Sequence, residues 1–312
     1  MVGPRPDLEV TLGPLRLQNP VLAASGTFGY GEEFEPFVDL QRLGGFVVKG
    51  LSLMPRQGNL YPRTCETPAG MLNSIGLQNI GIDTFLEDKL PRLRTLNTAV
   101  IANLYGESVE EFAALADRVE ASMGLAAVEL NLSCPNTPMG GMLFGVDEDL
   151  TEKVVRTVRE RTKLPLIVKL TPNVTRIERL GEAARRGGAD ILSLVNTFVG
   201  MAIDVHKRTP RLATITGGLS GPAIKPLAVC LVHQVAQKVG LPVMGMGGIQ
   251  NAEDAIEFVL AGASAVQVGT ANYFNPSATL EVLSGIEAYC RRHEIRHVRD
   301  LVGALEEKPP ES

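Results

Sequence analysis

The segment PVMGMGGIQNAEDAIEFVLAGASAVQVGT, residues 242–270, holds two apolar runs on either side of one amphipathic stretch. The runs 242–248 and 265–270 are almost continuously apolar, which is typical of parallel strands buried on both faces. Between them, the stretch 252–263 repeats apolar residues at helical spacing and has a glycine near its end. The segment therefore predicts a strand–helix–strand unit of a parallel sheet.

The same unit recurs along the whole chain. Further apolar runs lie at 21–25, 45–50, 99–104, 126–131, 165–170 and 191–196, which makes eight in all. Amphipathic stretches separate them, among them 108–124, 147–162 and 175–188. Eight strand–helix units predict an α/β fold of one domain, a single (β/α)8 TIM barrel. We expect the barrel domain to span residues 1–304 and a flexible tail to follow at 305–312.

Three additions to the plain barrel are expected. The stretch LEVTLGPLRL, residues 8–17, alternates apolar and polar residues around Gly-Pro and predicts an N-terminal hairpin at the lower end of the barrel. The connections after strands 2 and 6, residues 51–81 and 197–222, are long, and the second could include a hairpin. We also expect the loop after strand 4, residues 132–145, to close over the site.

Composition excludes several classes of protein. The chain has 312 residues, 45% of them hydrophobic, and a net charge of −5 without a basic block, so nucleic acid is not an expected partner. No secretory signal and no membrane-spanning apolar run is present, which predicts a cytoplasmic protein. Cys65, Cys134, Cys230 and Cys290 are far apart in the sequence and show no metal-ligand spacing. We therefore expect free thiols, no metal site, and no iron–sulfur cluster on this chain.

Polar residues and glycines follow the predicted strands at the end where barrel enzymes place their chemistry. These positions are Ser25, Lys49, Asn103, Asn131, Lys169, Asn196, Gly247-Gly248 and Gly269-Thr270. The glycines after strands 7 and 8, with a following helix N-terminus, predict a phosphate cradle, although turn glycines are the simpler alternative. No GxGxxG motif occurs, so we expect no dinucleotide site on this chain.

The two lysines at strand ends leave several chemistries open. Lys49 and Lys169 could form Schiff bases in a lyase, or act as fixed charges that stabilise a reduced flavin or hold a substrate carboxylate. Each could also simply face solvent. The amides point to the substrate, because Asn73, Asn131, Asn136 and Asn196 together match a planar ring with alternating N–H and C=O groups. Any single one of these asparagines could instead satisfy backbone groups of a turn.

Cys134 lies just beyond strand 4 in the stretch NLSCPNTPMGG, residues 131–141. A thiol with a pKa of ~8.5 can remove a proton from carbon when it is well placed. The alternatives are a buried thiol that packs as a small apolar group, and a nucleophile, although no histidine is adjacent to activate one. We interpret the remaining cysteines, one on a loop and two in helical patterns, as structural.

Several stretches together resemble the class 1 dihydroorotate dehydrogenases, which are flavoenzymes of pyrimidine synthesis. The matching stretches extend from about residue 19 to residue 275, and ELNLSCPN and NSIGLQN are the most specific of them. The full set is NPVLAASGTFGYG, VVKG, ETPAGMLNSIGLQNIGID, ANLYG, ELNLSCPN, VKLTPNV, LVNT, TGGLSGPAIKPLA, MGMGGI and VQVGTA.

The resemblance implies a site, residue by residue, and a reaction, the FMN-dependent oxidation of dihydroorotate to orotate in UMP synthesis. Cys134 would be the catalytic base. FMN would contact Ala24, Ser25, Lys49, Gly50, Asn103, Asn131, Lys169, Val195, Gly221, Gly247, Gly248, Gly269 and Thr270. Substrate would be held by Lys49, Asn73, Ser74, Ile75, Gly76, Leu77, Asn131, Asn136, Asn196 and Thr197.

Within class 1, the motifs look like the B type. Such catalytic chains pair with a subunit that carries FAD and a [2Fe–2S] cluster and passes electrons to NAD+. The resemblance thus implies a homodimer of this chain inside a heterotetramer, with no membrane partner. Three alternatives stay open: an A-type enzyme that uses fumarate without a partner, a Schiff-base lyase or synthase acting on a sugar phosphate, and a flavin-free barrel that only binds a ligand.

Overall fold

Eight parallel strands close into a barrel in the computed structural model, which describes residues 5–132 and 144–306. In barrel order from β3, each strand pairs with the next, and β16 pairs back with β3. The strands are β3 (Val21–Ala23), β4 (Gly45–Val47), β7 (Ala99–Leu104), β8 (Ala127–Asn131), β9 (Leu166–Lys169), β10 (Ile191–Leu194), β15 (Val243–Met246) and β16 (Ala265–Val268). Each falls within one of the predicted apolar runs, so the (β/α)8 barrel is confirmed.

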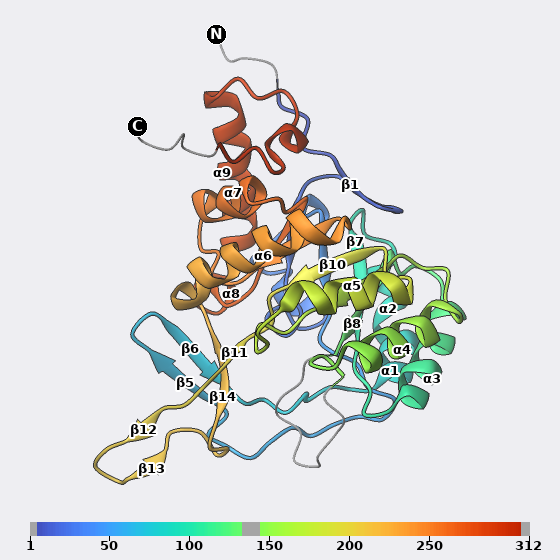
Figure 1. The fold of residues 1–312 in the computed structure, drawn as a ribbon, viewed down its shortest axis with the longest axis vertical. Coiled ribbons are helices and arrows are strands. Elements are labelled where there is room, and N and C mark those ends of the chain that lie inside the picture. The colour runs from blue at the N-terminus through green and yellow to red at the C-terminus, as the bar shows by residue number, and fades with distance from the viewer. Residues whose placement is uncertain (1–4, 133–143, 307–312) are drawn as a thin grey trace.

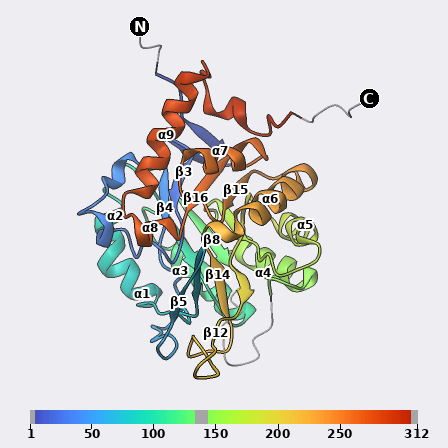
Figure 2. The same cartoon turned by 90° about the vertical axis from the view of Figure 1, so that its left-hand side faces the viewer.

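Helices surround the barrel and cover the outer face of its strands (Figures 1 and 2). The longer ones are α3 (Val109–Glu120), α4 (Glu148–Arg159), α5 (Ile177–Gly187), α6 (Lys225–Val239), α7 (Ala252–Leu260) and α9 (Ala278–Arg292). Short helical segments are η1 (Glu32–Phe34), η2 (Leu40–Arg42), α1 (Ile82–Thr84), η3 (Phe85–Lys89), α2 (Leu90–Leu93), η4 (Pro222–Ile224), α8 (Ala271–Phe274) and η5 (Val298–Leu301). Several helices begin where the sequence places a capping side chain: Ser108, Asp147 and Asn251 accept hydrogen bonds from the first turns of α3, α4 and α7.

The predicted N-terminal hairpin is present. Strands β1 (Val10–Leu12) and β2 (Leu15–Leu17) pair antiparallel around Gly13, which has a φ of 55°. Gly13 lies against Asp190, the residue that precedes β10. The hairpin therefore packs at the amino ends of the barrel strands, opposite the end that carries the candidate site.

The two long connections form a second sheet at the carboxyl ends of the barrel strands. Strands β5 (Thr64–Thr67) and β6 (Gly70–Asn73) lie after barrel strand 2, and β11 (Phe198–Gly200) and β14 (Gly217–Ser220) lie after barrel strand 6. They pair in the order β11-β14-β6-β5 (Figure 1), and a small hairpin of β12 (Ile203–Asp204) and β13 (Thr209–Pro210) extends from them. The hairpin in the second connection is thereby confirmed, whereas Cys65 lies in strand β5 and not on a loop.

Part of the sequence-based predictions concerns residues outside the described ranges. Most of the loop after strand 4, including Cys134 and Asn136, and residues 307–312 of the predicted tail lie there. Among the described helices, none combines the length and apolarity needed to cross a bilayer. Across residues 5–132 and 144–306, no cluster of three or more histidine, cysteine or acidic side chains could hold a metal ion.

Candidate active site

One pocket at the carboxyl ends of the barrel strands collects almost every described residue of the predicted site. Its lining includes Ala24, Ser25, Lys49, Gly50, Asn73, Ile75, Gly76, Leu77, Asn103, Asn131, Lys169, Val195, Asn196, Thr197, Gly221, Gly247, Gly248, Gly269 and Thr270. Ser74 is the exception: it is fully buried away from the lining, and its hydroxyl has no partner among the described residues. The individual roles of these residues stay predictions, but they do share one cavity.

Further residues line the same pocket without having been predicted. They are Gly26, Thr27, Thr64, Met71, Ser220, Ile224, Met246, Gln267 and Tyr273. Thr64 lies on β5 and Met71 on β6, in the connection after barrel strand 2. Ser220 lies on β14, in the connection after barrel strand 6. No pattern in the sequence shows that these two connections meet, because they pair only in the folded sheet.

Glycines form one wall of the pocket in conformations that other residues adopt with strain. Gly221, Gly247 and Gly248 have φ values of 93°, 130° and 79°. A Cβ added to Gly248 would come 2.8 Å from the Gly221 carbonyl oxygen. The short segment η4 and then helix α6 follow Gly221, so the positive end of a helix dipole lies beside these glycines. This arrangement agrees with the predicted phosphate cradle.

A charged contact fixes the start of α6 behind these glycines. The Lys225 ammonium donates hydrogen bonds of 2.6 Å to both Asp254 and Glu257 on α7. The hydrogen bond to Asp254 raises the pKa of Lys225 most, and the bond to Glu257 raises it further, so the side chain stays charged at neutral pH. Asp254 in turn accepts from the backbone of Gln250 and Asn251 in the capping box of α7. This contact holds together the first turns of α6 and α7, the helices that follow barrel strands 6 and 7.

The two predicted lysines enter the pocket from different strands. Lys49 follows β4, and its ammonium lies beside Gly26, where an added Cβ would be 3.9 Å from it. Lys169 ends β9, its side chain is only 7% exposed, and its ammonium is 3.9 Å from a carboxylate oxygen of Glu129. A buried lysine opposed by a carboxylate acts as a fixed charge.

Three of the predicted asparagines converge from separate elements. Asn196 donates to the side-chain oxygen of Asn131 at 3.3 Å and accepts from the backbone of Thr197 at 2.8 Å. Asn73, at the end of β6, donates weakly to the Gly218 carbonyl at 3.4 Å. Amide groups are therefore present on two sides of the pocket, as expected for recognition of a planar ring with mixed donors and acceptors.

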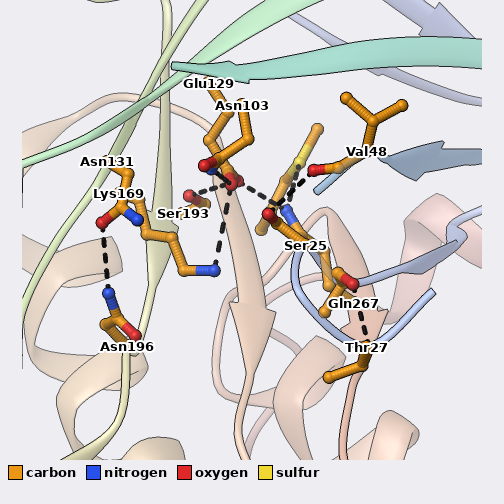
Figure 3. Close-up of polar contacts among 12 residues, drawn as sticks. Ser25, Thr27, Val48, Asn103, Glu129, Asn131, Lys169, Ser193, Asn196 and Gln267 are labelled. Atoms are coloured by element: carbon orange, nitrogen blue, oxygen red, sulfur yellow. Dashed lines mark hydrogen bonds and ion pairs between the residues drawn. The ribbon is translucent and has the colours of Figure 1, made fainter. Parts of the chain in front are cut away.

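Beneath these residues lies a buried polar cluster centred on Glu129 (Figure 3). The Glu129 side chain is 0% exposed and accepts hydrogen bonds from Asn103 at 2.7 Å, Ser193 at 2.8 Å and Gln267 at 3.0 Å. These partners come from strands β7, β10 and β16, so the carboxylate connects opposite sides of the barrel. Three donors and a nearby ammonium are what an ionised carboxylate requires when water is excluded.

Two oxygens of this cluster have no partner among the described residues. They are Asn103 Oδ1 and Gln267 Oε1, both buried on residues that line the pocket. A buried acceptor without a donor destabilises a protein by about 1–3 kcal/mol, so these atoms mark a position for a bound donor. The pyrimidine portion of a flavin carries an N–H group between two carbonyls, and the glycine wall suits a phosphate. The residues present therefore fit FMN.

Glu129, Ser193 and Gln267, which form this buried cluster, were not predicted, although the sequence carries a signal for them. Each is a polar residue inside an otherwise apolar strand run: AAVELN, ILSLVN and AVQVGT. Side chains in a barrel strand alternate between the interior and the helices, so such a residue must find polar partners in the interior. Only the closed barrel shows that Ser193 and Gln267 both donate to Glu129.

The fold and the pocket define a class: a (β/α)8-barrel enzyme with its site at the carboxyl ends of the strands, built for an anionic ligand with a polar ring. The chain belongs to the dihydroorotate dehydrogenase family. The family model described as "Dihydroorotate dehydrogenase" matches residues 7–289.

Curated relatives agree over nearly their whole length. A protein of Geotalea daltonii is 54% identical over 301 residues, which is 96% of this chain and 99% of the relative. A protein of Bacteroides thetaiotaomicron is 51% identical over 300 residues, with the same two shares. Both relatives are named "Dihydroorotate dehydrogenase B (NAD(+)), catalytic subunit".

Proposed function

We propose that this chain is the FMN-binding catalytic subunit of a B-type dihydroorotate dehydrogenase, which oxidises dihydroorotate to orotate in pyrimidine synthesis. The observation that supports it most directly is the pairing of a glycine wall with two buried, partnerless acceptors in one pocket. The relatives named for this activity match almost the full chain. When bound, FMN supplies the acceptor for the hydride that leaves the substrate.

The residues of the chain would divide the remaining work. Lys49 would bind the substrate carboxylate, and the Asn131 and Asn196 amides would hold the ring, so that both reacting carbons stand in fixed positions. Cys134, three residues after Asn131, would remove the proton from C5. Lys169 would stabilise negative charge at the pyrimidine end of the cofactor. Asn73 would complete the pocket from the second sheet.

Electrons would leave this chain through a partner. The relatives' names describe a catalytic subunit and NAD+, which fits a second subunit carrying FAD and a [2Fe–2S] cluster. A homodimer inside a heterotetramer fits the exposed apolar side chains on the second sheet, on its hairpin and on the segments that lead into β5 and β14, since apolar patches often mark protein interfaces. These side chains are Leu60, Tyr61, Val199, Met201, Ile203, Val205 and Ile215. A cytoplasmic location fits Cys65, Cys230 and Cys290, which are free thiols.

The purified chain is expected to be yellow, with about one FMN per chain, and dihydroorotate should bleach it under anaerobic conditions. NAD+ should then reoxidise the flavin quickly only when the partner subunit is added. The measurement is an anaerobic titration followed by addition of NAD+ or fumarate, with and without partner. Rapid turnover of the lone chain with fumarate would instead assign the A type. A colourless chain that borohydride traps on a sugar phosphate would assign the Schiff-base lyase.

Replacement of Lys49 by methionine is expected to weaken orotate binding roughly 10- to 100-fold, the loss typical of a hydrogen bond between charged groups. The spectrum of the bound flavin reports the affinity. Uracil, the same ring without the carboxylate, is the matched control, and its weaker binding should not change. An equal loss for both ligands would show that Lys49 does not recognise the carboxylate.

A further inference from the structure

Glu129 lies at the base of the pocket as an ionisable residue to which the reaction assigns no task. It is fully buried, and its neighbours Val128 and Leu130 on β8 are fully buried apolar residues. Isolated charges are rarely buried in a barrel interior, because desolvation strongly disfavours them. Five strands meet at this carboxylate through Asn103, Lys169, Ser193, Gln267 and Glu129 itself (Figure 3).

The carboxylate determines which way two amides point. An amide has a donor end and an acceptor end, so an amide that donates to Glu129 must turn its oxygen elsewhere. Asn103 and Gln267 both donate to Glu129. Asn103 Oδ1 lies beside Gly50, 2.9 Å from where a Cβ on that pocket residue would be. Both amides are therefore set as acceptors on residues that line the pocket, and FMN offers donors that would suit them, the ring N–H group and the ribityl hydroxyls.

Glu129 also opposes the charge of Lys169. The two charged groups are 3.9 Å apart, with side-chain exposures of 0% and 7%. In such a dry setting a charge acts over a longer range than it does in water. The carboxylate therefore holds the ammonium at the lining of the pocket and reduces the net positive charge there.

We propose that Glu129 is a positioning residue that orients Asn103 and Gln267 as acceptors for the bound flavin and, by opposing Lys169, sets the flavin reduction potential. This inference rests on the proposed function, because it takes FMN as the ligand of the pocket. We assign Glu129 no contact with the substrate. Its effect is exerted through Asn103, Gln267 and Lys169.

The test is the two-electron midpoint potential of the bound flavin in Glu129→Gln, measured by dye-equilibrated reductive titration without dihydroorotate. Loss of this negative charge removes its opposition to the positive charge of Lys169, which favours the reduced, anionic ring. We expect the equilibrium to shift at least tenfold toward the reduced flavin, or about 30 mV more positive for a two-electron couple. FMN affinity should also fall, since glutamine cannot accept from all three donors.

Ser193→Ala is the matched control, because it removes a buried hydrogen bond to the same carboxylate but keeps the charge. Its potential should stay within a few millivolts of the parent. If Glu129→Gln does not fold, Lys169→Gln is compared with the double variant Glu129→Gln/Lys169→Gln, which removes both opposite charges. The double variant should have the more positive potential, again by at least tenfold in the equilibrium.

The outcomes separate this inference from the proposed function. Flavin bound at full occupancy with an unchanged potential in Glu129→Gln, or equal potentials in the Lys169 pair, overturns the role of Glu129 alone. A flavin that is bound but not reduced by dihydroorotate overturns the proposed reaction, while the potentials still test Glu129. A chain that takes up no flavin overturns both.

Discussion

Cys134→Ser is expected to retain FMN but to slow flavin reduction by dihydroorotate by roughly 10²- to 10⁴-fold, the usual contribution of a positioned general base. A hydroxyl ionises far less readily than a thiol, so the serine variant has almost no base at neutral pH. In the parent enzyme the base must be deprotonated to act. The rate should therefore rise with pH through the thiol pKa, ~8.5 when unperturbed, and level off above it.

The measurement is anaerobic stopped-flow reduction across a pH series, with Cys230→Ser as control. Cys230 is an exposed residue of α6 whose sulfur accepts a hydrogen bond from Gln234 at 3.6 Å, so its replacement should leave the rate and pH profile unchanged. An unaltered reduction rate in Cys134→Ser would remove this thiol from the mechanism. A slow rate without the thiol-like pH dependence would assign it a role in positioning instead.

Gly248→Ala is expected to lose FMN, with affinity lowered at least ~100-fold, because two effects act together. Its φ of 79° costs a residue with a Cβ about 1–2 kcal/mol. The new Cβ would also come 2.8 Å from the Gly221 carbonyl oxygen and 3.0 Å from the Lys225 backbone nitrogen. The Gly221 oxygen belongs to the wall that would hold the phosphate and Lys225 lies behind it, so relief of these contacts would displace the cradle.

Gly240→Ala separates these effects. Gly240 ends α6 with nearly the same φ, 73°, and an added Cβ there would meet nothing within 4 Å. This control should be slightly less stable in thermal unfolding but should keep its flavin. The measurements are FMN content after purification and the FMN dissociation constant of the apoprotein from fluorescence quenching. Equal affinities in the two variants would contradict the assignment of the cradle.

The barrel could be predicted from the sequence because its strands are buried on both faces. Runs such as 165–170 and 191–196 contain few polar residues, and the polar residue at or near the end of each run marks the carboxyl end of the strand. In a barrel all such ends meet at one face, so Lys169 and Asn196 could be assigned to one site without coordinates. The structure confirms that they share a pocket.

The pairing of residues within the site could not be predicted. Glu129 contacts side chains 26, 64 and 138 positions away, and periodicity within one strand does not show which side chains will meet across the barrel. The second sheet was missed for the same reason, since strands β6 and β14 pair although they belong to different connections. Cys65 was placed on a loop because β5, with the sequence TCET, lacks the continuous apolar run of a barrel strand.

The second sheet has a practical consequence for altering this enzyme. Asn73 pairs with Gly218, so the wall contributed by one insertion depends on backbone hydrogen bonds from the other. Homologous swaps that transplant residues 51–81 alone would leave an open strand edge and a misplaced amide. Substrate specificity should therefore be transferable between related enzymes only when both insertions are exchanged together as one cassette.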